Sequence, residues 1–160
     1  KYQGIPVQSN SGHSFINDPM REHNAVYGGE MSAHHYFRDF SYCDSGMIPW
    51  LLVVSVLSET GQSLSSLVEE MITKFPCSGE INFKVADTQI TIQKLFDHFA
   101  NQNPSIDHTD GVSLDFGAWR FNVRASNTEP LLRLNIETRL DQHPKPMQDY
   151  VDELTRLIQN

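Results

Sequence analysis

Residues 132–137, Leu-Arg-Leu-Asn-Ile-Glu, alternate apolar and polar side chains without interruption. Alternation with a period of two is typical of a β-strand that buries one face. Two further strand-like segments precede it, at 112–116 and 119–124, and the pairs Asp110-Gly111 and Gly117-Ala118 stand before and between them as turn sequences. These residues predict three antiparallel strands in the second half of the chain.

Helical patterns flank these strands in the sequence. Residues 92–100 carry apolar side chains at three- and four-residue spacing, and Pro146 opens a final segment with the same spacing. Another alternating segment, residues 81–85, comes before the first of these helices. The second half is therefore predicted to be an α+β domain with an antiparallel sheet and helices that cover one face of it.

The first half has a different pattern, in which helices follow short strands. Residues 47–57 are apolar almost all round, which indicates a helix that is buried on most sides, and Asp44 is the expected N-cap. A second helix follows, and Pro76 ends it. We expect residues 1–75 to be part of an α/β domain and residues 76–160 to be the α+β domain.

The composition argues against several classes of protein. Twelve Lys and Arg residues against twenty Asp and Glu residues give a formal net charge of −8, so neither a nucleic acid nor an anionic membrane is an expected partner. The longest apolar run, residues 47–57, is shorter than the roughly 18 residues that span a bilayer. Cys43 and Cys77 are too few for a disulfide framework, and two free thiols suit the cytoplasm. Because the chain has no initiator Met, we expect it to be cut from something longer.

The segment Gly28–His35 places a carboxylate, a hydroxyl and two imidazoles directly after a predicted strand. Loops in that position often bind ligands. The carboxylate of Glu30 could accept hydrogen bonds from two adjacent hydroxyls, which is what a pyranose offers. The alternative is that Glu30 is a solvated loop acid and that the glycines only form a turn.

The segment 124–130 concentrates hydrogen-bond donors between two predicted strands. It contains a guanidinium, two hydroxyls, an amide and several backbone N–H groups, a set that suits a phosphate dianion. The alternative is a polar hairpin in which Ser126 and Asn127 satisfy the turn backbone and Arg124 is a charge at the end of a strand.

The two segments, in this order, resemble the α-D-phosphohexomutases, and the resemblance covers essentially the whole chain. Residues 29–32 followed by His34 are similar to the sugar-specificity loop of the third domain of that family, and residues 124–128 are similar to the phosphate-binding loop of the fourth. Met31 is typical of the phosphomannomutase and dual phosphomannomutase/phosphoglucomutase group, and residues 42–47 also resemble bacterial members of that group. The resemblance identifies the chain as the C-terminal part of such an enzyme, namely the latter half of domain 3 and the complete domain 4.

The resemblance implies a role for each residue of the two loops. Glu30 and Ser32 would bind the sugar hydroxyls, and His34 would be a neighbouring ligand contact. His13 stands in a Ser-Gly-His segment similar to the Thr-Gly-His of the family, so it would also reach the substrate. The phosphate that is not reacting would be bound by Arg124, Ser126, Asn127 and Thr128. The implied substrates are mannose or glucose 1- and 6-phosphates, held between the two loops.

The resemblance also implies what lies elsewhere in the enzyme. A phosphomannomutase interconverts mannose 6-phosphate and mannose 1-phosphate through a phosphoserine and a hexose 1,6-bisphosphate, with Mg²⁺ bound in an Asp-Gly-Asp-x-Asp-Arg loop. The serine lies in a Thr-Ala-Ser-His-Asn-Pro segment, and neither string occurs in these 160 residues. We therefore expect this chain to be inactive alone and to supply recognition, with the N-terminal domains of the same enzyme as its partners.

Three alternatives stay open at this point. His13, His23, His34 and His35 could indicate a metal-binding module, although their spacing matches no common zinc pattern. The chain could also be a stand-alone, non-catalytic domain that binds sugar phosphates. Finally, the parent enzyme could be specific for glucose phosphates rather than mannose phosphates.

Overall fold

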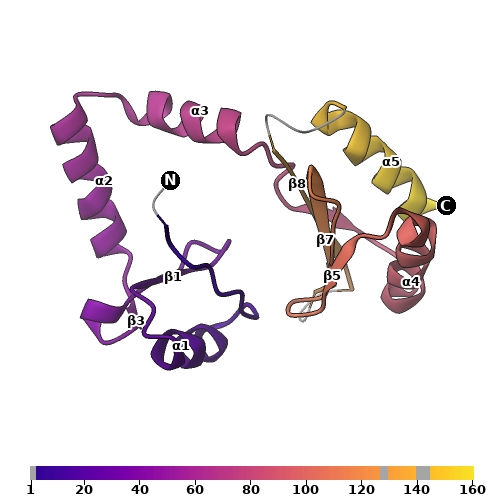
Figure 1. Cartoon of the computed structure of the whole chain (residues 1–160), viewed down its shortest axis with the longest axis horizontal. Coiled ribbons are helices and arrows are strands. Elements are labelled where there is room, and N and C mark those ends of the chain that lie inside the picture. The colour runs from indigo at the N-terminus through magenta and orange to yellow at the C-terminus, as the bar shows by residue number, and fades with distance from the viewer. Residues whose placement is uncertain (1–2, 127–129, 140–144) are drawn as a thin grey trace. The chain divides into compact units, whose positions relative to one another are not determined.

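The chain forms two compact units in a computed structural model that describes residues 3–126, 130–139 and 145–160 (Figure 1). The first unit is Lys1–Leu64 and the second is Ser65–Asn160. Each unit has a hydrophobic core of its own.

The second unit is built on a five-stranded antiparallel sheet in the order β4-β8-β7-β6-β5. The strands are β4 (Ile81–Phe83), β5 (Ser105–Asp107), β6 (Val112–Asp115), β7 (Trp119–Ala125) and β8 (Leu132–Thr138). The two long central strands, β7 and β8, pair from Trp119↔Thr138 to Ala125↔Leu132. Helices α4 (Thr88–Phe99), followed by the 3-10 turn η2 (Ala100–Gln102), and α5 (Met147–Gln159) lie together on one side of the sheet (Figure 1). This arrangement confirms the predicted α+β domain with an antiparallel sheet.

The alternation in the sequence explains how this sheet is held. Phe121 and Val123 of β7 and Leu134 and Ile136 of β8 are at most 1% exposed, and their side chains form one core with residues of α4 and α5. The polar residues between them point away from that core. Strand β5 was not predicted, because its three residues, Ser105–Asp107, are too few to show a periodic pattern.

The segment before β4 is fixed to the sheet. The backbone N–H of Ser78 donates to the carbonyl of Ile136 at 2.9 Å, and the N–H of Thr138 donates to the carbonyl of Pro76 at 3.0 Å. The hydroxyl oxygen of Ser78 also accepts from the N–H of Ile136 at 2.9 Å. Residues 76–78 therefore continue the edge of the sheet beside β8.

The first unit combines a short antiparallel sheet, in the order β1-β2-β3, with two helices. Its elements are α1 (His13–Glu22), β1 (Tyr27–Gly29), β2 (His35–Phe37), the 3-10 turn η1 (Arg38–Phe40), β3 (Cys43–Asp44) and α2 (Met47–Thr60). Ile16 and Met20 of α1 pack with Tyr36 of β2 to form the core. A Cβ atom on Gly28 would lie 2.6 Å from Sδ of Met20 and 3.0 Å from Cγ2 of Ile16, so a larger residue at this position would displace side chains of α1.

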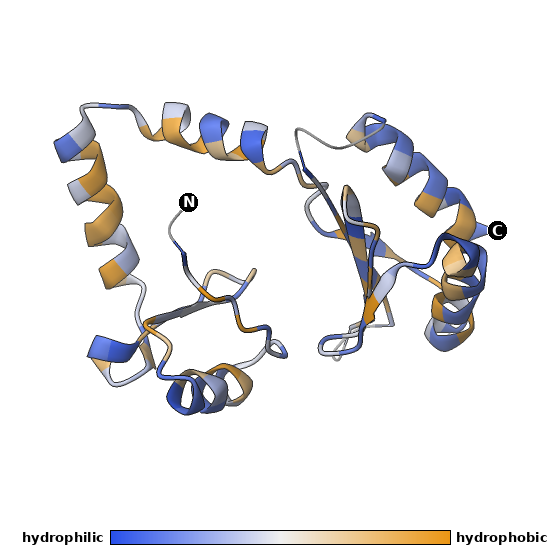
Figure 2. Cartoon of the chain, in the orientation of Figure 1, coloured by the Kyte–Doolittle hydropathy of each residue, from blue (hydrophilic) through white to orange (hydrophobic). Residues whose placement is uncertain are grey.

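Two expectations about α2 were wrong. Asp44 does not cap the helix, which begins at Met47 after Gly46; the hydroxyl of Ser45 accepts from the N–H of Ile48 at 3.3 Å instead. Secondly, α2, which is described in full, has no buried residue, and Trp50 and Leu51 are 58% and 55% exposed. Apolar residues run along α2 and also along α3 (Leu64–Lys74), as Figure 2 shows.

Within the described residues, no single helix is long and apolar enough to cross a membrane. Helices α2 and α3 reach that threshold only when they are taken together across the break between them.

Candidate functional site

The loop that connects β1 and β2 is a tight hairpin loop. The N–H of Ala33 donates to the carbonyl of Glu30 at 3.1 Å, and the N–H of Glu30 donates to the carbonyl of His34 at 3.0 Å. Ala33 has a φ of 65°, so the loop is a turn followed by one left-handed residue, a common connection between antiparallel strands. Met31 and Ser32 therefore stand at the exposed tip, and Glu30 and His34 stand at the base.

The carboxylate of Glu30 is held at both oxygens. The hydroxyl of Tyr36 donates to Oε1 at 2.5 Å, and the backbone N–H of Gly12 donates to Oε2 at 3.0 Å. The ring of His13 meets the ring of Tyr36 edge to face, with centroids 5.2 Å apart. Two of the predicted ligand residues, Glu30 and His13, therefore converge on Tyr36, although they are 17 positions apart in the chain.

His34, a third predicted ligand residue, is paired with Asp44. Nδ1 of His34 lies 2.7 Å from Oδ2 of Asp44, and Oδ1 of Asp44 accepts from the backbone N–H of His35 at 2.9 Å. The hydrogen bond and the negative charge of Asp44 raise the pKa of the His34 imidazole above its ordinary value. The same hydrogen bonds, first that from His34, lower the pKa of Asp44. This pairing therefore favours the protonated form of the imidazole at the base of the loop relative to an isolated histidine.

The histidines do not gather around a common point. His35 places Nδ1 2.7 Å from the hydroxyl of Tyr27, away from the pair that His34 forms with Asp44. Among the residues that the structure describes, no group of three or more His, Cys, Asp or Glu side chains could hold a metal ion. The described residues therefore do not fit the Mg²⁺ that the resemblance implies or the zinc of a histidine module.

The predicted phosphate loop begins at the end of β7. Arg124 faces Arg133 across the β7–β8 pair, and both guanidinium groups approach the carboxylate of Glu80, at 3.4 and 3.6 Å. The N–H of Ser126 donates to the carbonyl of Leu131 at 2.8 Å, which closes the base of the loop. Asn127 and Thr128, the other two predicted phosphate ligands, lie outside the described residues. The described part thus concentrates two positive charges beside one negative charge.

Three residues of these sites were not among the site residues predicted from the sequence: Tyr36, Asp44 and Glu80. Asp44 was expected to cap a helix, yet it lies in residues 42–47, a run that resembles the phosphomannomutase group, and this was the available signal. Glu80 lies directly before β4, where only the pairing with β8 brings it to the two arginines. For Tyr36 the sequence offered no signal, because β2 itself was not predicted.

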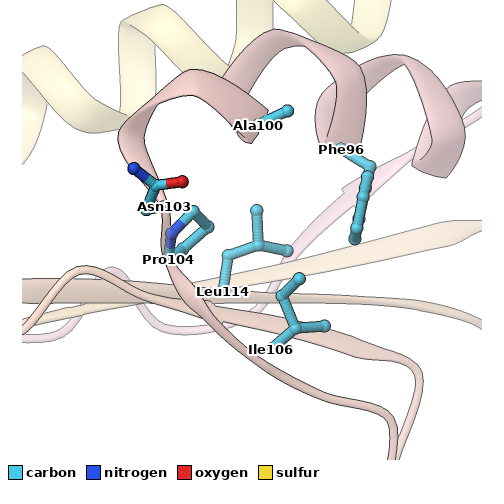
Figure 3. Close-up of a pocket in the computed structure, with 6 residues that line it drawn as sticks. All are labelled: Phe96, Ala100, Asn103, Pro104, Ile106 and Leu114. Atoms are coloured by element: carbon cyan, nitrogen blue, oxygen red, sulfur yellow. The ribbon is translucent and has the colours of Figure 1, made fainter.

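The second unit also contains two cavities that lie outside the predicted sites. One, of about 230 Å³, is lined mostly by apolar side chains of α4, β5 and β6, among them Phe96, Ile106 and Leu114 (Figure 3). It carries no charged side chain, so it is unsuited to a phosphate. The other, of about 590 Å³, lies at the start of β7, where Arg120 forms a two-point ion pair with Glu137. Arg120 is held by both oxygens of Glu137, at 2.8 and 3.1 Å, whereas Arg124 makes one contact of 3.4 Å with Glu80, which it shares with Arg133. Arg124 is therefore the better candidate for a phosphate ligand.

Comparison with protein families gives two matches that follow one another along the chain. The model described as phosphoglucomutase/phosphomannomutase, alpha/beta/alpha domain III, matches residues 1–75. The model described as phosphoglucomutase/phosphomannomutase, C-terminal domain, matches residues 80–154. Together they cover both units.

Individual relatives are similar over most of this chain. A protein named "Phosphohexose mutases" from Xanthomonas campestris pv. campestris is 63% identical over 138 residues, which are 86% of this chain and 31% of that relative. "Phosphomannomutase" from Vibrio cholerae serotype O1 is 54% identical over 159 residues, 99% of this chain and 34% of that relative. "Phosphomannomutase" from Escherichia coli K12 is 54% identical over 138 residues, 86% of this chain and 30% of that relative. The chain thus spans about a third of the length of the curated relatives that it matches.

A solved structure agrees at the level of the fold. A phosphoglucomutase/phosphomannomutase family protein from Burkholderia thailandensis superposes with a TM-score of 0.70 at 23% sequence identity. The superposition covers 98% of this chain and 32% of that protein.

Proposed function

Since this chain belongs to the phosphoglucomutase/phosphomannomutase family, we propose that it supplies the sugar and phosphate recognition of a phosphomannomutase. The reaction is the interconversion of mannose 6-phosphate and mannose 1-phosphate through a phosphoserine enzyme and a hexose 1,6-bisphosphate. We assign residues 1–75 to the third domain and residues 76–160 to the fourth. The observation that carries this proposal is the carboxylate of Glu30, held at both oxygens at the base of the β1–β2 loop.

The β1–β2 loop is the part proposed to bind the sugar. Each carboxylate oxygen of Glu30 accepts one hydrogen bond from the protein and keeps a second lone pair, so the carboxylate can still accept from two neighbouring hydroxyls. The hydroxyl of Ser32, at the exposed tip, would add a further contact. His34 stands at the base of the same loop, and a protonated His34 would donate to a hydroxyl or phosphate oxygen of the ligand. His13, whose ring contacts that of Tyr36, would add a further contact.

The loop after β7 is the part proposed to bind the distal phosphate. Arg124 presents a planar set of donors that matches phosphate oxygens, with Ser126, Asn127 and Thr128 as the other ligands. Glu80 would orient the guanidinium before the ligand arrives. Binding energy from a phosphate that does not react can then be used to orient the end of the sugar that does react.

The remaining parts of the reaction are assigned to domains that would precede this chain. Those domains would supply the serine nucleophile and the Mg²⁺ that neutralises developing charge on the transferred phosphoryl group. They would also cover α2, whose apolar residues are exposed here but suit a helix inside an α/β layer. A metabolic enzyme of this kind would act in the cytoplasm.

Glucose phosphates are a second candidate substrate class. The name "Phosphohexose mutases" of the Xanthomonas relatives favours activity on more than one hexose. A carboxylate that accepts hydrogen bonds from two ring hydroxyls can bind both sugars where the two sugars carry those hydroxyls in the same orientation. The ratio of kcat/KM for mannose 1-phosphate and glucose 1-phosphate measures this directly.

The test is a mutase assay on the full-length protein that contains this chain. With Mg²⁺ and a hexose 1,6-bisphosphate, it should convert mannose 1-phosphate into mannose 6-phosphate, whereas the 160-residue chain alone should not. Arg124→Ala should raise KM about 10- to 100-fold, because a charge-assisted hydrogen bond to phosphate is lost. Arg120→Ala is the matched control, since Arg120 lies on the same strand but pairs with Glu137. Absence of turnover with both hexose phosphates, or equal effects of the two substitutions, would contradict the proposal.

A further inference from the structure

Tyr36 occupies an unusual place in the first unit. It is the middle residue of β2, paired with Gly28 of β1 and Asp44 of β3, and it is 1% exposed, whereas its neighbours in β2 are only partly buried. Its ring packs against Ile16 and Met20 in the core of the unit. A phenylalanine would fill the same space, so packing alone does not call for the hydroxyl.

The Tyr36 hydroxyl has a specific hydrogen-bond partner. It donates to Oε1 of Glu30 at 2.5 Å, a short distance of the kind that a charged acceptor gives. Burial, and then this hydrogen bond to the charge of Glu30, raise the pKa of Tyr36, so the hydroxyl keeps its proton over the whole physiological range. A permanent donor is thus fixed in the core and directed at the carboxylate.

The second oxygen of Glu30 is held from a different direction. Oε2 accepts from the N–H of Gly12, the residue before α1, whose φ of 126° is readily adopted only by glycine. Gly12 has no side chain that could cap α1. The carboxylate of Glu30, which lies outside the helix, accepts from the backbone N–H at the start of the helix instead. One carboxylate therefore connects the β1–β2 loop, β2 and the start of α1.

We propose that Tyr36 is a positioning residue that sets the affinity for the sugar by locking the carboxylate of Glu30 in the orientation that receives the ring hydroxyls. This inference rests on the proposed function, in which Glu30 binds the sugar. Without the Tyr36 hydroxyl, Oε1 loses its buried donor, and the side chain of Glu30 gains rotational freedom that sugar binding must remove again. Tyr36 touches Glu30 and not the reacting atoms, so its effect falls on binding rather than on phosphoryl transfer.

A double-mutant cycle in the full-length mutase tests this proposal. Tyr36→Phe should raise KM for mannose 1-phosphate about 3- to 10-fold and leave kcat nearly unchanged, and Glu30→Ala should raise KM further. In the Glu30→Ala background, Tyr36→Phe should have no additional effect, because the acceptor through which it acts is already removed. Tyr42→Phe is the matched control: it removes a hydroxyl of the same unit that lies 3.4 Å from Oδ1 of Asn24 and makes no contact with Glu30.

An NMR measurement on the 160-residue chain tests the contact itself, independently of catalysis. The ring carbon that bears the Tyr36 hydroxyl should change its chemical shift in Glu30→Gln, because its hydrogen-bond acceptor loses its charge. The corresponding ring carbon of Tyr42 should keep its chemical shift in Glu30→Gln. An unchanged Tyr36 signal in Glu30→Gln would overturn the inference even if Tyr36→Phe destabilised the mutase.

The outcomes separate the inference from the proposed function. If Glu30→Ala raises KM but Tyr36→Phe adds its full effect in that background, Tyr36 is not a positioning residue, and Glu30 keeps its proposed role. If Glu30→Ala leaves KM unchanged, Glu30 does not bind the sugar, and both the role of Glu30 and the inference built on it fail. Coupling in the cycle, together with the change of the Tyr36 ring-carbon shift in Glu30→Gln, supports the inference.

Discussion

At the scale of single residues, His34 and Asp44 each shift the pKa of the other. Because the pKa of His34 is raised in the folded protein, the stability it contributes is full below about pH 6.5 and is lost as the pH rises through the raised value. Because the pKa of Asp44 is lowered, its contribution is present above about pH 3.9 and is lost as the pH falls through the lowered value. The charged pair is therefore complete in the window between these two steps.

We predict that Asp44→Asn lowers the pKa of His34, because the asparagine offers neither the negative charge nor a carboxylate acceptor. The measurement is an NMR pH titration of the His34 ring protons in the 160-residue chain. Asp39→Asn is the control, since the carboxylate of Asp39 pairs with Arg38 at 3.4 Å. An unchanged His34 titration in Asp44→Asn would show that the pair does not persist in solution.

At the scale of elements, α2 has the sequence of a buried helix but is exposed in the structure. Its residues are apolar on every side, yet none of them is buried in the structure, which describes α2 completely. Leaving apolar surface in water costs about 25 cal/mol per Å², so such a helix is favourable only where another layer covers it. The relatives are about three times longer than this chain, which is consistent with a covering layer elsewhere in the full-length protein.

We predict that Leu51→Gln is nearly neutral in the 160-residue chain, because Leu51 is 55% exposed. In the full-length protein the same change should cost about 1–3 kcal/mol of unfolding free energy, since a covered leucine would be replaced by a polar side chain. Urea unfolding of both proteins measures the two values, with Glu59→Gln on the same helix as the control. Equal effects of Leu51→Gln in the two proteins would argue that nothing covers this part of α2.

At the scale of the whole molecule, the two units differ in the size of their cores. The core of the second unit contains buried residues from both long strands and both flanking helices. The core of the first unit consists of Ile16, Met20 and Tyr36, with Ala25 and Tyr42 packed against it. Since stability follows the apolar area that is buried, the first unit should open at a lower free energy than the second.

We predict that hydrogen exchange distinguishes the two units. Backbone amides of Val123 and Leu134, in the central strands of the second unit, should exchange at least about tenfold more slowly than those of β2 in the first unit. Ile136→Ala, at a position that is 0% exposed, should accelerate exchange in the second unit only. Identical protection in both units, lost together in Ile136→Ala, would mean that the chain unfolds as one cooperative body.

Much of the second unit could be predicted because its signals are local. The alternation in β7 and β8 and the three-four spacing in α4 and α5 follow directly from which face each element buries. Helix α1 was missed because Pro19 lies inside it and it buries only Ile16 and Met20. The short strands β2 and β3 were missed because three and two residues are too few to show a periodic pattern.

The amino-acid sequence by itself determined the α+β character of the second half, the two polar loops and their resemblance to the phosphohexomutases. Only the tertiary structure decided that Tyr36 and Gly12 hold Glu30, that Asp44 pairs with His34 instead of capping α2, and that Glu80 lies beside Arg124. The physical reason is that periodicity reports which face of an element is buried, whereas a hydrogen bond between distant side chains depends on strand register and on where a helix packs.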